Sequence, residues 1–163
     1  MPGTECISRS PEETVELGRQ LAKRLAPPVL VLLSGELGSG KTTLTKGIIS
    51  GLGAAREEDV TSPTFTLVHV FQNHGKVYHV DLYRVEDFHD LETLALEDAL
   101  AEPAIVIIEW SERFSLRSDW PRVVVRLEHL DGAARRIVIS DLAASEAGIS
   151  HPGSPQPDTE VPG

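Results

Sequence analysis

The fold is decided by the stretch Val29-Leu30-Val31-Leu32-Leu33-Ser34-Gly35-Glu36-Leu37-Gly38-Ser39-Gly40-Lys41-Thr42. Its first five residues are all apolar, a pattern typical of a strand buried on both faces of a sheet. A glycine-rich loop follows. Between Lys41 and Leu52, Gly47 is the one helix breaker before Gly51, and Gly51 and Gly53 can cap the C-terminus of a helix. The stretch therefore predicts a strand, a tight loop and a helix.

The loop carries the phosphate-binding pattern known as the P-loop, with Gly35, Gly40, Lys41 and Thr42 at its fixed positions. Glycines let successive backbone N–H groups turn toward phosphate oxygens, and the helix N-terminus adds positive partial charge. Lys41 can reach the β- and γ-phosphates, and the Thr42 hydroxyl can ligate Mg²⁺. The alternative is an ordinary glycine-rich turn, but a chance match to this pattern rarely falls between a strand and a helix. We therefore expect a nucleotide site made by these residues: Gly38, Ser39, Gly40, Lys41, Thr42 and Thr43.

The other segments complete an α/β pattern. Ser10-Pro11-Glu12-Glu13 reads as a capped helix start, and the helix should run to about Leu25, before Pro27-Pro28. A third helix is expected at about 87–100. Five segments have strand composition, with turn residues predicting hairpins between the first two and between the last two: 66–72, 76–83, 104–108, 122–130 and 134–142. We expect an α/β, P-loop NTPase-like three-layer sandwich with a mixed sheet containing β-hairpins.

An acid that positions a metal ion commonly stands at the end of a second buried strand in P-loop enzymes. Glu109 has this position, because it directly follows the apolar run 104–108. The alternative is a solvated carboxylate at a strand end. We expect Glu109 and Thr42 to form the metal site.

Asp81 is a second acidic candidate. Strand alternation places Val77, His79, Asp81 and Tyr83 on one face, and if that face looks toward the γ-phosphate, Asp81 could orient the attacking water or hold Mg²⁺ through water. Otherwise Asp81 is an exposed residue paired with lysine or arginine. His79 fits a structural histidine as well as a functional one. Similarly, the segment 61–64 could be a phosphate-sensing switch loop or simply a loop.

Composition limits the classes of protein. The net charge of −10 disfavours strong unaided binding to nucleic acid, because an acidic chain gains little from counterion release. Cys6 is the only cysteine, which excludes an internal disulfide, and we expect it near a mobile chain end. No secretory signal or bilayer-length apolar run is visible, so we expect a soluble, cytoplasmic protein without membrane attachment. We expect one P-loop domain over 1–142 and a disordered tail over 143–163, which is poor in large apolar residues.

Four blocks in this order resemble the TsaE family, also called YjeE: Gly35-Glu36-Leu37-Gly38-Ser39-Gly40-Lys41-Thr42-Thr43, Thr61-Ser62-Pro63-Thr64-Phe65-Thr66-Leu67-Val68, Tyr78-His79-Val80-Asp81-Leu82-Tyr83-Arg84 and Ile108-Glu109-Trp110. The resemblance covers roughly residues 10–142. Members are small bacterial P-loop ATPases needed for the threonylcarbamoyladenosine modification of tRNA.

The resemblance implies a Mg²⁺-dependent ATPase, slow without its partners, that acts on the TsaB and TsaD proteins and meets tRNA only through that complex. TsaD, not this chain, would transfer the threonylcarbamoyl group. By motif, Lys41 and the loop amides hold phosphate, Thr42 and Glu109 hold Mg²⁺, and Asp81 is needed for hydrolysis. Lys41 and Asp81 are thus the expected catalytic residues.

Two other functions share the same site. A small-molecule kinase usually needs an arginine-rich lid over the phosphates, and the sequence shows no such insertion. A nucleotide-dependent assembly factor would differ only in kinetics. Spacing does not assign an arginine finger among the arginines considered: Arg84, Arg113 and Arg136.

Overall fold

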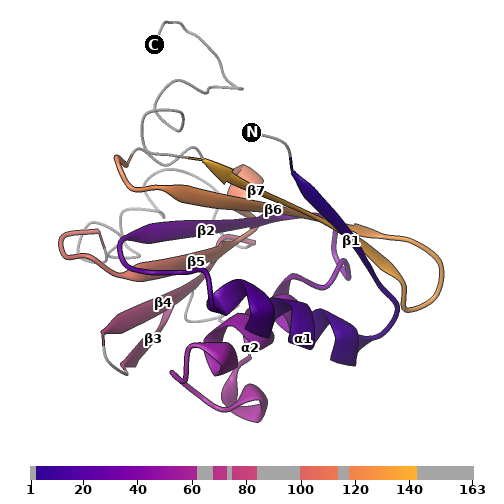
Figure 1. Cartoon of the computed structure of the whole chain (residues 1–163), viewed down its shortest axis with the longest axis horizontal. Helices are drawn as coiled ribbons and strands as arrows, with labels where there is room; N and C mark the ends of the chain where they lie inside the picture. The colour runs from indigo at the N-terminus through magenta and orange to yellow at the C-terminus, as the bar shows by residue number, and fades with distance from the viewer. Residues whose placement is uncertain (1–2, 62–67, 73–74, 84–99, 114–117, 143–163) are drawn as a thin grey trace, which may run out of the picture.

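The structure, a computed structural model, describes residues 3–61, 68–72, 75–83, 100–113 and 118–142. Within these residues the strands form one seven-stranded sheet in the order β1-β7-β6-β2-β5-β4-β3 (Figure 1). The strands are β1 (Thr4–Ser8), β2 (Val29–Ser34), β3 (Val68–Gln72), β4 (Lys76–Asp81), β5 (Ile105–Glu109), β6 (Arg122–His129) and β7 (Arg135–Leu142). The central neighbours β6, β2, β5 and β4 are parallel, whereas β3 and β7 pair antiparallel as hairpins with β4 and β6. The predicted α/β fold with a mixed sheet and hairpins is confirmed.

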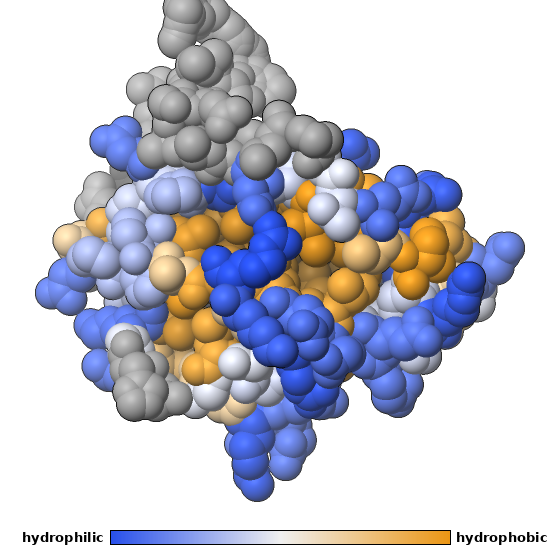
Figure 2. Space-filling model, viewed as in Figure 1, coloured by the Kyte–Doolittle hydropathy of each residue, from blue (hydrophilic) through white to orange (hydrophobic). Residues whose placement is uncertain are grey.

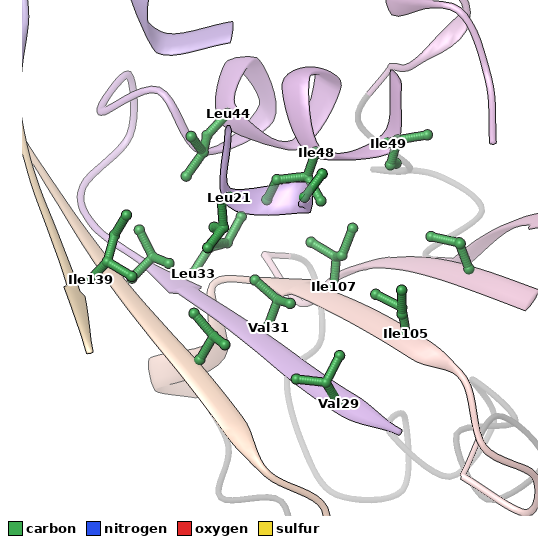
Figure 3. Close-up of a cluster of buried hydrophobic side chains, with 14 of the residues drawn as sticks. Leu21, Val29, Val31, Leu33, Leu44, Ile48, Ile49, Ile105, Ile107 and Ile139 are labelled. Atoms are coloured by element: carbon green, nitrogen blue, oxygen red, sulfur yellow. The ribbon is translucent and has the colours of Figure 1, made fainter. Parts of the chain in front are cut away.

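Helices α1 (Pro11–Ala22) and α2 (Lys41–Gly51) lie together on one face of the sheet (Figure 1). Between them and the sheet is the main apolar core, shown in Figure 3. Leu44 and Ile48 of α2 are fully buried and meet Val31 and Leu33 of β2 within this cluster. The face of the molecule in Figure 2 has hydrophobic residues at its middle and hydrophilic residues around most of its rim. This core holds α2, and with it the end of the glycine-rich loop, against the sheet.

The start of α1 follows the predicted cap. Ser10 Oγ accepts a hydrogen bond from the Glu13 backbone N–H at 3.1 Å, and Glu13 Oε1 accepts one from the Arg9 N–H at 2.7 Å. The helix ends at Ala22 rather than near Leu25, because the next residues bond three positions back, as in a tighter 3₁₀ turn.

Small residues set the approach of α1 to α2. A Cβ atom built on Gly47 would lie 2.0 Å from the Val15 carbonyl oxygen, and one on Gly18 would lie 2.4 Å from the Leu44 carbonyl oxygen. Both distances are far shorter than a carbon–oxygen contact allows. Gly47, which the sequence marks only as a possible breaker, therefore lets the two helix backbones touch.

Strand β1 corrects the sequence-based reading of the N-terminus. Residues Thr4–Ser8 pair antiparallel with β7, with Cys6 opposite Ile137, so Cys6 lies in an edge strand of the sheet and not at a mobile end. The helix expected at 87–100 falls almost entirely outside the described residues, and the tail at 143–163 lies outside them altogether. Among the residues that the structure describes, no helix is long and apolar enough to cross a membrane.

Candidate functional site

The candidate site lies where parallel strands end. Glu109, the last residue of β5, is in register with Leu33 of β2 on one side and with Asp81, the last residue of β4, on the other. The carboxyl ends of these strands share one edge of the sheet, and the glycine-rich loop leaves β2 at the same edge. In open α/β sheets, ligands bind at this edge.

The loop adopts backbone angles that glycine permits. Gly35 has φ 147°, Gly38 φ 81° and Gly40 φ 106°. A Cβ atom on Gly35 would also lie 2.4 Å from the Leu127 carbonyl oxygen, so a side chain is excluded there on two grounds. The Ser39 N–H donates to the Glu36 carbonyl at 3.0 Å, which closes the turn before α2.

Lys41 lies inside the loop rather than in solvent. Its Nζ donates to the carbonyl oxygens of Gly35 at 2.5 Å and Glu36 at 2.9 Å, and lies 3.7 Å from the centroid of the Trp110 ring. Burial lowers the pKa of Lys41 below the ordinary value of 10.5, and nearby carboxylates oppose this effect: Glu112, Glu109, Asp81 and Glu36. The positive charge of Lys41 is thus held within the loop, where a phosphate group would bind.

Thr42 and Glu109 meet directly, although they are 67 positions apart in the sequence. The Thr42 hydroxyl donates to the Glu109 carboxylate, at 2.8 Å from Oε1 and 3.1 Å from Oε2. Glu109 is only 2% exposed, and its Oε2 also lies 2.5 Å from His79 Nε2. The structure therefore brings the two residues predicted to form the metal site into contact, and adds His79 to them.

Asp81 is buried beside this group, with 3% of its surface exposed. Its Oδ1 accepts a hydrogen bond from the Tyr83 N–H at 2.9 Å. Val77 packs in the core under the helices and His79 reaches Glu109, so strand alternation directs Asp81 to the same face. The interpretation of Asp81 as an exposed sheet residue is therefore wrong.

The donors at this edge fit Mg²⁺ bound together with a nucleotide. Because the Thr42 hydroxyl gives its proton to Glu109, the lone pairs of Thr42 Oγ1 remain available to a cation. No group of three or more His, Cys, Asp or Glu side chains in the described part of the chain could hold a metal ion alone. Mg²⁺ commonly keeps several waters and takes one or two protein ligands plus phosphate oxygens, which is what this edge allows.

Some contacts at the site were not predicted from the sequence. Trp110 has φ 63°, rare for a non-glycine residue, and this turn lays its ring against Lys41 and, at 4.9 Å between centroids, against Tyr83. Glu112 accepts from the Gly35 N–H at 3.3 Å, tying the segment after β5 to the loop. For the contact between Trp110 and Lys41, the one sequence signal was the position of Trp110 directly after Glu109.

The arginines considered as arginine fingers and the candidate switch loop either have partners elsewhere or lie outside the described residues. Arg136 is paired with Glu128 at 2.7 Å and with Glu5 at 3.1 Å. Arg84, the side chain of Arg113 and residues 62–64 of the candidate switch loop lie outside the described residues. Instead, Arg135, which the sequence did not single out, lies beside the loop, with its Nε 3.9 Å from a Cβ built on Gly40.

Comparison with known proteins identifies the family. The model of the family described as "Threonylcarbamoyl adenosine biosynthesis protein TsaE" matches residues 8–137. The chain is 33% identical over 135 residues to the tRNA threonylcarbamoyladenosine biosynthesis protein TsaE of Treponema pallidum, covering 83% of this chain and 98% of that protein. It is 36% identical over 137 residues to the protein of the same name from Aquifex aeolicus, covering 83% and 94%.

A solved structure supports the fold independently of the sequence. The crystal structure of Bacillus subtilus YdiB superimposes with a TM-score of 0.65 and 24% identity, over 88% of each chain. At that identity the likeness concerns the fold alone. The family match over most of the chain and the identity to full-length relatives together show that this chain belongs to the TsaE family.

Proposed function

We propose that the chain binds and hydrolyses ATP with Mg²⁺ and thereby serves the threonylcarbamoyladenosine modification of tRNA. The observation that carries the proposal is the contact of Thr42, at the start of the phosphate-loop helix, with the buried carboxylate of Glu109. P-loop NTPases use such a pair to hold Mg²⁺. The relatives' names support the pathway, since each is a tRNA threonylcarbamoyladenosine biosynthesis protein TsaE.

Each residue then has a distinct task. Lys41 leaves the carbonyl oxygens of the loop and binds the β- and γ-phosphates, while the amides of residues 38–43 surround the phosphate oxygens. Thr42 and Glu109 would hold Mg²⁺, whose charge would stabilise the negative charge of the transferring phosphoryl group. Asp81, which is buried next to Glu109, would orient the attacking water.

The proposed partners are TsaB and TsaD type proteins. The chain has 25 acidic against 15 basic residues, which is unfavourable for holding tRNA by itself. A partner complex that binds tRNA in the cytoplasm would remove this difficulty. The chain would act on that complex by ATP hydrolysis and would not itself transfer the threonylcarbamoyl group.

Phosphate release with and without purified TsaB and TsaD tests reaction, nucleotide and partnership together. We expect slow release alone and faster release with both partners. Lys41→Ala, Asp81→Ala and Glu109→Ala should each reduce turnover by roughly 10²-fold or more, since they remove the groups that act on the phosphate, the attacking water and Mg²⁺, respectively. Exposed Lys23→Ala is the matched control and should leave turnover unchanged. Normal turnover in all three site variants would refute the assignment.

Two other functions remain distinguishable by experiment. Transfer of labelled phosphate from ATP to a metabolite rather than to water would indicate a small-molecule kinase. If a variant that binds ATP without hydrolysing it still supports repeated rounds of tRNA modification, the chain is a nucleotide-dependent assembly factor. Among the residues that the structure describes, no contact specifically favours either of these two functions.

A further inference from the structure

His79 occupies an unusual place for a polar residue. It lies on β4, next to the edge strand β3, in register with His69 of β3 on one side and Ile107 of β5 on the other, and its side chain is fully buried. Its Nδ1 has no hydrogen-bond partner among the described residues. A buried polar atom without a partner is unfavourable, so a leucine would fill this position with less penalty. The reason for a histidine must lie with its other nitrogen.

The other nitrogen, Nε2, contacts the Glu109 carboxylate. Nε2 lies 2.5 Å from Glu109 Oε2, and because an ionised carboxylate only accepts hydrogen bonds, Nε2 carries the proton. Thr42 Oγ1 reaches the same carboxylate, with its shorter contact to Oε1. The carboxylate is therefore held from two directions, by β4 and by the first turn of α2, and its rotation is restricted.

We propose that His79 is a positioning residue that fixes the Glu109 carboxylate in the orientation required for Mg²⁺ bound with nucleotide. The inference rests on the proposed function, in which Glu109 is the acid at the metal. Without the Nε2–H donor, Glu109 keeps only the Thr42 contact, so the carboxylate can turn away and lose part of its hold on the cation. Loss of His79 should therefore weaken Mg²⁺ binding and leave phosphate binding by the loop unchanged.

Calorimetric titration of ADP in the presence and absence of Mg²⁺ separates these two effects. His79→Leu should leave Mg²⁺-free ADP affinity unchanged, because that binding depends on the loop. The additional affinity that Mg²⁺ provides should fall by roughly 10–100-fold, as is usual when a partner of a metal ligand is lost. His79→Gln, which keeps an N–H donor, should recover part of it.

His69→Leu is the matched control. His69 lies one strand further from Glu109, with its ring 6.2 Å from the His79 ring, and its loss should leave the Mg²⁺ effect at the wild-type level. In a Glu109→Gln background, His79→Leu should cause no further change in the Mg²⁺ effect, because His79 acts only through Glu109.

Three outcomes would overturn the inference. One is an unchanged Mg²⁺ effect in both His79 variants. The second is an equal loss of ADP affinity with and without Mg²⁺ in both, which would make His79 only a structural residue. The third is an additive loss in the Glu109→Gln background. If the wild-type chain itself shows no Mg²⁺ effect and no ATP hydrolysis, the proposed function fails instead, and the inference falls with it.

Discussion

The Lys41 ammonium group has partners within the phosphate loop itself. Its hydrogen bonds to the Gly35 and Glu36 carbonyl oxygens and its position over Trp110 hold it within the loop. A phosphate group that binds Lys41 therefore competes with these partners and not only with water. The group that enters must carry enough negative charge to compete with carbonyl dipoles, which phosphate does and a neutral ligand does not.

The lowered pKa of Lys41 makes nucleotide affinity depend on pH. Phosphate binds the protonated amine, and burial reduces the pKa of that amine below 10.5 in the free protein. As the pH rises through this lowered pKa, Lys41 must take up a proton to bind, and affinity falls by up to about tenfold per pH unit. Titration of Mg²⁺-free ADP across the alkaline range measures the slope.

Lys41→Met is the control for this pH dependence, because it removes the titrating amine. Its affinity should be low throughout and should lack the Lys41 contribution to the slope. The same alkaline slope in wild type and Lys41→Met would show that another group is responsible.

At the scale of helices, the site depends on how closely α1 approaches α2. Gly18 and Gly47 face each other at the crossing, with the Cβ position of Gly47 lying 3.0 Å from the Gly18 Cα. Since α2 begins at Lys41 and carries Thr42, a shift of this helix moves both residues relative to Glu109. The helix crossing therefore supports the site through the position of α2.

Gly47→Ala should destabilise the protein although alanine favours helix. The added methyl group would meet the Val15 carbonyl oxygen, which is backbone and cannot rotate away, so the helices must separate. We expect a loss of roughly 1–3 kcal/mol in the free energy of unfolding, typical of an overpacked contact. Urea denaturation measures it, with Lys46→Ala on the preceding position as the control that should change stability by less than about 0.5 kcal/mol. Equal stability of wild type and Gly47→Ala would contradict this account.

The elements with strong local signals were predictable. Continuous apolar runs identified β2 and β5, the Ser10 cap identified the start of α1, and Asp131-Gly132 marked the β6–β7 turn. Strand β1 was not found, because its five residues include Thr4, Glu5 and Ser8 and it is held by pairing with β7, far away in the sequence. Local composition carries little information about such an edge strand.

At the site, too, the features with a local sequence signal were predictable and those made by long-range contacts were not. The phosphate loop is a local pattern, and Glu109 follows from its place at the end of a buried strand. The contacts of Glu109 with His79 and of Lys41 with Trp110 depend on which strands are neighbours and on one left-handed residue. No spacing in the sequence encodes these, since they are made between elements that meet only in the folded sheet.

At the scale of the whole molecule, net charge determines what the chain can hold alone. With a net charge of −10, we expect no specific tRNA binding by the isolated protein at about 0.15 M salt, and a dissociation constant weaker than about 10⁻⁴ M, the weak end of non-specific nucleic-acid binding. Fluorescence anisotropy of labelled tRNA measures this. In the presence of TsaB and TsaD, tRNA binding should be observed. Micromolar tRNA binding by the isolated chain would contradict the expectation.

The order of the strands also affects how the chain is made. Strand β2, which carries the phosphate loop, pairs only with β5 and β6 in the described sheet, and these begin at Ile105 and Arg122. On the ribosome, β2 and the loop therefore emerge long before either neighbouring strand exists. Parallel pairing over such separations forms slowly, and an apolar strand without neighbours is open to aggregation and chaperone binding. The phosphate loop is therefore synthesised well before the strands that complete the nucleotide site.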